Sequence, residues 1–416
     1  MSNKSFFKNW GDIGIWIIVA IFAMISVVAV FSSSSFLARG ADVTRVNFLI
    51  EQLQSVALGF ISLFVLYLIP MKVYRSFSFL AYFLAVALII CGLVFGETIN
   101  GANRGISIGG RTIQVLEPAK IAIVLYLARA IEHFKIDNFW KYLLYLILPV
   151  AVLCLLVIII AVLSLLTLII AGINWKYILA TIGIGVAAFL MLFFIYTQIS
   201  PSTHITSDGI EVVAEQDSKK EQSVFYKVFN RFGVIVDRFS QHSITSESVD
   251  ISEKSEAELD EIRQSENAKI AIREGGLLGK GPGNSTQRYH LSLAFSDFIF
   301  AFIIEEYGLF FATFIMLLYL AFLARTINIG MECTTKYASL VSIGLGMLIT
   351  IQALIHILVN VRVIPITGQT LPLISHGGTA YVFLPGAVAI ILSISGNENQ
   401  RKRVDPEKKI VENEKI

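Results

Sequence analysis

The sequence predicts an all-α, polytopic membrane protein of about ten transmembrane helices. The composition is strongly apolar, with 55% hydrophobic residues, 15% charged residues and a mean hydropathy of +0.72. Apolar runs long enough to cross about 30 Å of hydrocarbon recur along the 416 residues. Positive charge is concentrated in short connectors and the C-terminal tail, as membrane orientation requires. The net charge of +2 therefore gives no indication of nucleic-acid binding.

Eight apolar runs each have the length of one span. They lie near residues 13–32, 52–70, 78–96, 117–131, 176–197, 298–323, 338–361 and 379–396. The first run follows Lys4 and Lys8 without a small-residue cleavage site, which is typical of an uncleaved first span. No spacing of cysteine and histidine supports a disulfide framework or a structural metal site.

Residues 142–172 decide the number of spans. Roughly 30 apolar residues make about 45 Å of helix, too long for one span and short for two. Two spans give ten in total, with both termini and the basic tail 397–416 in the cytoplasm. One span would turn that tail outward, against the positive-inside bias. We therefore expect ten spans in a single membrane domain, 1–416.

Ten spans leave three notable segments outside the membrane: 97–116, 198–297 and 362–378. The second is a large extracytoplasmic loop between spans 7 and 8. Its parts 201–222 and 240–267 are polar, lack hydrophobic periodicity and are predicted to be mobile. The pattern between Phe225 and Phe239 predicts either an amphipathic helix in the interface or a surface helix packed on the outer loops.

A carboxylate after a glycine-rich stretch is the strongest candidate for chemistry. The glycines run from Gly275 to Gly283, and Asp297 follows at the mouth of an apolar run. Glu305 and Glu306 come next, inside that run. Carboxylates at such depth are costly and usually face a partner in the bundle, so a structural pairing with a basic residue of another span is the main alternative for these two.

Basic residues are expected on the same side as Asp297. Arg104 and Arg111 lie in the first outer segment, and Lys120 follows Glu117 by three residues on one face of the helix that Pro118 opens. Such cations suit a phosphate or pyrophosphate group at headgroup depth. The alternative is that they are solvated anchors, with Lys120 only pairing with Glu117.

The segment 365–379 contains two prolines and three glycines, which forbid a continuous helix, yet it is apolar. We expect it either to fold back into the protein, where its backbone groups find partners, or to form a rigid turn between spans. His356, in the preceding run, is predicted to be an interhelical hydrogen-bonding residue rather than a catalyst.

Several blocks, in order along the chain, resemble signatures of the SEDS family (shape, elongation, division and sporulation). They are Asn100 to Arg104, Gln114 to Lys120, Gly275 to Ser285, Ser296 to Phe300, Glu305 to Gly308, Gln352 to Ile355 and Thr367 to Thr379. The Pro-Ile-Thr-Gly-Gln and Gly-Gly-Thr forms are more similar to the cell-division member than to the elongation member. Val115-Leu116 and the unbroken 142–172 region depart from the family pattern.

The resemblance implies a peptidoglycan glycosyltransferase of the bacterial inner membrane, working at the division septum. Its substrate would be lipid II, and its partners a class B penicillin-binding protein transpeptidase and other divisome proteins. Asp297 matches the family's essential outer-loop aspartate and would be catalytic. Substrate-binding candidates are Arg104, Arg111, Glu117, Lys120, Ser375 and His376. No cofactor is certain, although a divalent cation (Mg or Mn) would suit a pyrophosphate beside a carboxylate.

The residue types agree with this chemistry. Joining a sugar hydroxyl to an anomeric carbon that bears pyrophosphate needs a base and cations, whereas a glycoside hydrolase usually shows two carboxylates across the bond. A lipid II flippase or other transporter is one competing function, and it would spread polar residues through the whole membrane depth. A non-catalytic division scaffold is the other, favoured if the short 142–172 region removes the cavity.

Overall fold

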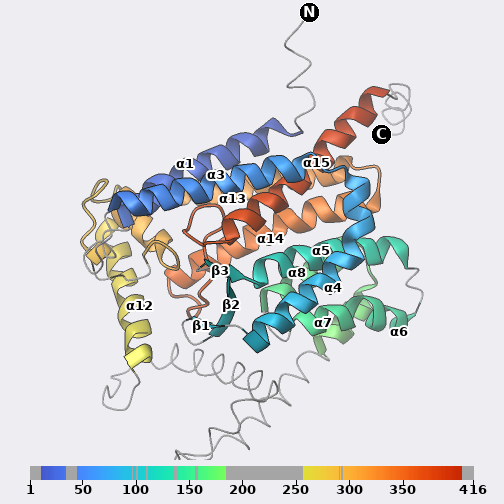
Figure 1. The fold of residues 1–416 in the computed structure, drawn as a ribbon, viewed down its shortest axis with the longest axis horizontal. Helices are drawn as coiled ribbons and strands as arrows, with labels where there is room; N and C mark the ends of the chain where they lie inside the picture. Colours follow the sequence, from blue (N-terminus) through green and yellow to red (C-terminus); the bar gives the residue numbers. More distant parts are fainter. Residues whose placement is uncertain are drawn as a thin grey trace, which may run out of the picture.

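The computed structural model describes residues 11–33, 45–95, 97–99, 102–108, 111–134, 138–154, 158–183, 256–289, 291 and 294–404. It is a bundle of long helices with one small sheet at its end (Figure 1). The α-helices are α1 Ile13–Ser33, α3 Arg45–Tyr67, α4 Met71–Phe95, α5 Leu116–His133, α6 Phe139–Tyr142, α7 Leu148–Cys154, α8 Ile158–Ile170, α12 Glu256–Gly275, α13 Ile299–Glu332, α14 Lys336–Asn360 and α15 Ala380–Val404. A π-helical turn, Leu143–Ile147, joins α6 to α7, and Gln287–Tyr289 form a 3-10 turn. The predicted helical membrane architecture is confirmed.

Five of the described helices are long and apolar enough to cross a membrane. They are Ile13–Ser33, Val46–Tyr67, Met71–Gly92, Ile299–Glu332 and Lys336–Asn360. The difficult region 142–172 contains two helical stretches, one ending at Cys154 and the next beginning at Ile158. The total of ten spans stays a prediction.

Helix α14 lies at the centre of the bundle and is buried on nearly all sides. Thr335 begins it by accepting a hydrogen bond from the Ala338 backbone N–H at 3.3 Å. Gly346 faces Thr326 of α13, and Gly344 faces Val124 of α5, each too closely for an added Cβ. Small residues at these points let helix backbones approach, which is how helices associate in membranes.

Helices α1 and α15 flank α3. Gly59 of α3 faces the Tyr381 carbonyl of α15, and Ser62 donates to the Val382 carbonyl at 2.8 Å. Gly11, just before α1, lies against the Leu392 backbone of α15. The beginning of α1 and the later part of α15 are therefore at the same end of the bundle (Figure 1).

The first outer segment forms a small antiparallel sheet, which we did not anticipate from the sequence. Its strands are β1 Glu97–Ile99, β2 Ala102–Ile108 and β3 Arg111–Gln114, in the order β1-β2-β3. Gly105 pairs with both Glu97 and Gln114. Each strand contains isoleucine, and two of the three contain threonine; both residue types favour strands.

Helix α12 corrects part of the expectation that 240–267 is mobile, because 256–267 are helical, whereas 240–255 lie outside the described residues. Ser265, Ala268 and Ala271 are buried at helical spacing. The two alanines pack with Phe298 and Phe302 in a small second core. The small residues of this stripe have little hydropathy of their own, so the charged composition of the segment hid it. The predicted helix 225–239, most of the large outer loop and the tail beyond residue 404 lie outside the described residues.

Candidate active site at one end of the helix bundle

The predicted outer segments meet at one end of the bundle. The Gln114 backbone N–H donates to Thr379 Oγ1 at 2.9 Å, which joins the end of the sheet to the start of α15. The His376 N–H donates to the Phe295 carbonyl at 2.9 Å, and Ser375 Oγ donates to the Ser296 carbonyl at 2.8 Å. The gathering expected from the topology is therefore confirmed for the described parts of these segments.

Asp297 lies half-buried in the turn that precedes α13. Its carbonyl accepts a hydrogen bond from Asn360 Nδ2 at 3.0 Å, and Asn360 Oδ1 accepts from the Ala301 N–H at 3.0 Å. Asn360 is fully buried at the end of α14. It therefore satisfies a first-turn N–H of α13 from a neighbouring helix and fixes the backbone at Asp297. Sequence reasoning missed Asn360; its only signal was an amide at the end of an apolar helix.

The segment 365–379 folds back into the protein, as the first of our two expectations stated. Leu371, Leu373 and Ile374 are buried. The Ile374 carbonyl accepts hydrogen bonds from Ser26 Oγ at 2.6 Å and Tyr381 OH at 3.0 Å. Ser375 Oγ also accepts from the Leu371 N–H at 2.8 Å while donating to Ser296. The geometry therefore favours a positioning role for Ser375 over direct contact with a substrate.

Lys120 and Glu117 form a buried ion pair, with Nζ and Oε1 2.7 Å apart. Lys120 Nζ also donates to Gln352 Oε1 at 2.8 Å and to Gln369 Oε1 at 3.4 Å. An ammonium group has three protons, so these contacts engage all of them. The pair thus ties α5 to α14 and to the folded-back segment, which favours the structural alternative for Lys120.

Three buried polar atoms beside this network have no hydrogen-bond partner among the described residues. They are Glu117 Oε2, His356 Nε2 and Thr367 Oγ1. His356 Nδ1 contacts the Gln369 carbonyl at 2.8 Å, which places His356 in the Lys120 neighbourhood. Buried atoms of this kind are normally satisfied by water or by a ligand. These atoms can therefore form hydrogen bonds with a water molecule or with a polar group of a ligand.

The glycine-rich loop wraps around the two acidic residues of α13. Glu305 accepts from Lys280 Nζ at 3.0 Å and from the Thr286 N–H at 2.8 Å, and Glu306 accepts from the Gly283 N–H at 3.0 Å. The pairing is structural, as the main alternative held, but the lysine comes from the loop rather than from another span. Gly308 interrupts the helical geometry with φ 79°, where the loop backbone packs against it.

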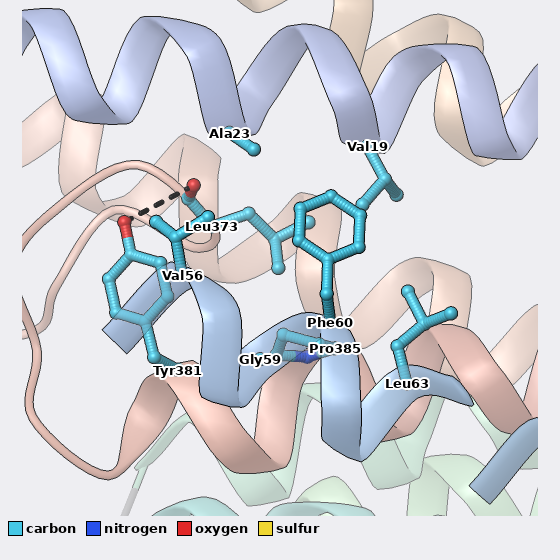
Figure 2. Close-up of a pocket in the computed structure, with 9 residues that line it drawn as sticks. All are labelled: Val19, Ala23, Val56, Gly59, Phe60, Leu63, Leu373, Tyr381 and Pro385. Carbon is cyan, nitrogen blue, oxygen red and sulfur yellow. Dashed lines mark hydrogen bonds between the residues drawn. The ribbon is translucent and has the colours of Figure 1, made fainter. Parts of the chain in front are cut away.

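A small apolar recess of about 20 Å³ lies between α1, α3 and α15, beside the folded-back segment (Figure 2). Ala23 lines it from α1, Val56 and Phe60 line it from α3, and Leu373 and Tyr381 border it toward the folded-back segment. Its lining is almost entirely hydrocarbon. A recess of this size has room for only about one water-sized group, so we assign no part of a substrate to it.

The remaining candidates are placed less completely. Arg104 lies in β2 and Arg111 begins β3, but their side chains are outside the described parts of the structure. Arg362, a further outer cation, forms an ion pair with Glu266 of α12. Among the described residues, no three His, Cys, Asp or Glu side chains gather in a group that could hold a metal ion.

Comparisons with known proteins agree on one family. The model of the FtsW/RodA/SpoVE family, described as "Cell cycle protein", matches residues 13–207 and 249–400. A Hydrogenovibrio crunogenus protein named "Probable peptidoglycan glycosyltransferase FtsW" is 27% identical over 407 residues, covering 93% of this chain and 92% of that protein. Stage V sporulation protein E of Bacillus subtilis is 26% identical over 93% of this chain and 98% of its own length.

Solved structures share the fold. Thermus thermophilus rod shape determining protein RodA superposes with a TM-score of 0.61 at 20% identity, covering 92% of this chain and 96% of that one. A chain from a structure titled "Structural coordination of polymerization and crosslinking by a peptidoglycan synthase complex" gives a TM-score of 0.66 at 19% identity, with 93% and 98% coverage. With the family model matching most of the chain, this multi-pass membrane protein belongs to the FtsW/RodA/SpoVE family.

Proposed function

We propose that this protein polymerises lipid II into the glycan strands of peptidoglycan during septal cell-wall synthesis. The observation that carries the proposal is the place of Asp297 at the end of the bundle where the predicted outer segments meet. Asp297 is half-buried, and Asn360 holds its backbone carbonyl. The family membership and the names of the relatives support the same activity. Membrane-embedded sugar transfer needs such a base at the membrane surface, where a lipid-linked substrate presents its headgroup.

In the proposed reaction, Asp297 takes the proton of the attacking sugar hydroxyl, or orients that hydroxyl, as the hydroxyl attacks the anomeric carbon. The bond from that carbon to the pyrophosphate oxygen breaks, and the lipid pyrophosphate leaves with its electron pair. Arg104 and Arg111 are the candidates for stabilising this charge. Lys120 contributes directly only if it releases Gln369, its most distant partner.

A divalent cation that bridges pyrophosphate and Asp297 stays a prediction. Because the described residues hold no cluster of three metal-ligating side chains, such an ion would take its other ligands from the substrate and water. That is the usual binding mode of Mg²⁺ with phosphates. We derive no step of the reaction through it.

The membrane setting follows from the same proposal. The protein lies in the bacterial cytoplasmic membrane at the septum, with both termini cytoplasmic and Asp297 at the outer surface. The beginning of α1 lies against the later part of α15, and this supports placing both termini on the same side of the membrane. The partner is a class B penicillin-binding protein transpeptidase within the divisome. The synthase complex among the structural neighbours supports a joint polymerising and crosslinking assembly.

Purified protein with its transpeptidase partner and labelled lipid II provides the test. Asp297→Asn keeps the size of the side chain but removes the basic oxygen, so glycan formation should fall by roughly 10²-fold or more. Asp12→Asn is the control, because Asp12 is a carboxylate just before α1, paired with Arg325 away from the site. Near-normal polymerisation by a folded Asp297→Asn protein would refute the assignment.

A further inference from the structure

A second polar network joins three helices to His376. Gln52 of α3 is fully buried, and its Nε2 donates to Ser26 Oγ at 2.7 Å and to Tyr381 OH at 2.8 Å. On its other side, Gln52 Oε1 lies 2.7 Å from His376 Nδ1. The network thus runs from α1 and α15 through α3 to the folded-back segment.

The orientation of the Gln52 amide is set by its two hydroxyl neighbours. Ser26 Oγ and Tyr381 OH lie 2.6 and 3.0 Å from the Ile374 carbonyl, and they also contact each other. One hydroxyl donates to that carbonyl, and the second donates to the carbonyl or to the first hydroxyl, so both protons are engaged. A hydroxyl has a single proton, so with that proton engaged each can only accept from the amide. The NH₂ group of Gln52 therefore faces the hydroxyls, and its oxygen faces His376.

This orientation determines the tautomer of His376. An amide oxygen carries no proton, so Nδ1 of the ring must donate the hydrogen bond. A neutral imidazole has one N–H, which leaves Nε2 as an acceptor. No described residue forms a hydrogen bond with Nε2. Burial lowers the pKa of His376, with the Glu51 carboxylate acting in the opposite direction, so the neutral ring is favoured at neutral pH.

His376 lies beside the segment that carries Asp297. Its backbone N–H binds the Phe295 carbonyl, and its ring packs edge-on against the Phe295 ring with centroids 5.9 Å apart. Among titratable groups, Glu51 of α3 acts on the ring electrostatically, and Tyr381 of α15 is joined to it through Gln52. Gln52 and Ser26 complete its surroundings.

We propose that Gln52 is a positioning residue that holds His376 in the Nδ1–H tautomer, so that Nε2 accepts a hydrogen bond from a hydroxyl or amide N–H of the substrate. A deprotonated pyrophosphate has only acceptors, so a neutral Nε2 cannot bind it. His376 therefore recognises the sugar or peptide part of the substrate beside Asp297. The identity of that substrate rests on the proposed function; the tautomer does not.

Nitrogen NMR of the full-length protein, labelled with ¹⁵N-histidine, tests the tautomer without substrate. The chain has six histidines, and His376→Phe identifies the signal while keeping an aromatic ring against Phe295. We expect a neutral ring protonated at Nδ1 in the wild type at pH 7.5, and a shift toward the Nε2–H form in Gln52→Leu. A wild-type ring protonated at Nε2, or at both nitrogens, would overturn the proposal.

Polymerisation of lipid II across pH tests the role. Gln52→Leu should lower turnover by about three- to tenfold at every pH, the equivalent of one hydrogen bond. Gln52→Glu keeps an acceptor for Nδ1–H, and the hydroxyls of Ser26 and Tyr381 can rotate to donate to it. Its carboxylate raises the pKa of His376, so the ring becomes charged at higher pH. Turnover of Gln52→Glu should therefore exceed that of Gln52→Leu at high pH. As the pH is lowered, the turnover of Gln52→Glu should begin to fall at a higher pH than that of the wild type, because the ring takes up its second proton earlier.

The possible outcomes distinguish the positioning role of Gln52 from the proposed glycosyltransferase function. Parallel pH profiles for both Gln52 variants, with equal losses of thermal stability, would show a purely structural role and refute the positioning role. Absence of glycan formation by the wild type with its partner would refute the proposed function instead. The NMR result would still decide the tautomer.

Discussion

Replacing Lys120 by methionine isolates the buried ion pair of α5. Methionine keeps most of the side-chain volume, but Glu117, which is only 4% exposed, would be left as a buried charge. Glu117 Oε2 already has no partner among the described residues, so the contact between Oε1 and Lys120 is the main interaction that offsets the cost of burying the Glu117 charge. Breaking a buried pair on one side costs about 3–5 kcal/mol. We expect Lys120→Met to destabilise the protein by that amount.

Adding Glu117→Gln to Lys120→Met should recover part of the loss, because no uncompensated charge remains. Coupling between contacting residues is about 0.5–3 kcal/mol. The measurement is thermal unfolding of Lys120→Met, Glu117→Gln and the double variant in one detergent. Lys176→Met is measured beside them because it removes an exposed lysine from a first helical turn far along the chain. Lys176→Met should be as stable as the wild type.

A stable Lys120→Met protein would refute this reasoning. If that variant unfolded at the wild-type temperature yet used the lipid II donor poorly across a titration, Lys120 would be a substrate contact. Its three internal hydrogen bonds would then have to open when the donor binds. Loss of stability without recovery in the double variant would instead mean that Gln352 and Gln369, rather than Glu117, make the decisive contacts.

Two further pairs of substitutions test the supports of the site. Gly275→Ala would place a Cβ 2.1 Å from the Ile304 carbonyl oxygen and should sharply lower thermal stability. Gly276→Asn, at φ 55° in open space, should change the stability by less than about 0.5 kcal/mol. Equal stability of the two variants would contradict the packing of the loop on α13. Asn360→Ala leaves the Ala301 N–H buried without its hydrogen-bond acceptor and should lower the stability by about 1–3 kcal/mol. Asn360→Asp keeps that acceptor but loses the donor to the Asp297 carbonyl, so it should lower turnover more than stability. An unchanged kcat in Asn360→Asp would show that Asn360 does not position Asp297.

The helices and the region of the site were predictable because their signals are local. An apolar run of the right length can be read without knowing its neighbours, and Asp297 stands out as a carboxylate between a glycine-rich stretch and such a run. The fold-back of 365–379 was likewise visible, as prolines and glycines in an apolar stretch. These inferences need only a few adjacent residues.

The contacts that hold the site were not predictable because they join distant positions. Asn360 meets Asp297 across 63 residues, and Gln52 meets His376 across 324. Either amide, read alone, is an ordinary polar residue in or beside a span. The sequence left two alternatives for Lys120 for the same reason, since Gln352 and Gln369, which favour the structural one, engage its protons from 232 and 249 positions away. Only the fold shows which amide faces which partner.

These separations also order the assembly of the protein during synthesis. The glycine-rich loop meets Glu305 across 25 residues, so it can close as soon as the first turns of α13 leave the ribosome. The surroundings of Asp297 must wait for the folded-back segment and the start of α15, which supply Ser375, His376 and Tyr381. Domains form progressively from the N-terminus as the chain is made. A nascent chain therefore carries its candidate base in an unfinished site until α15 is in place. A truncation before α15 would retain the loop and Asp297 while lacking Tyr381, which supports the folded-back segment through the Ile374 carbonyl.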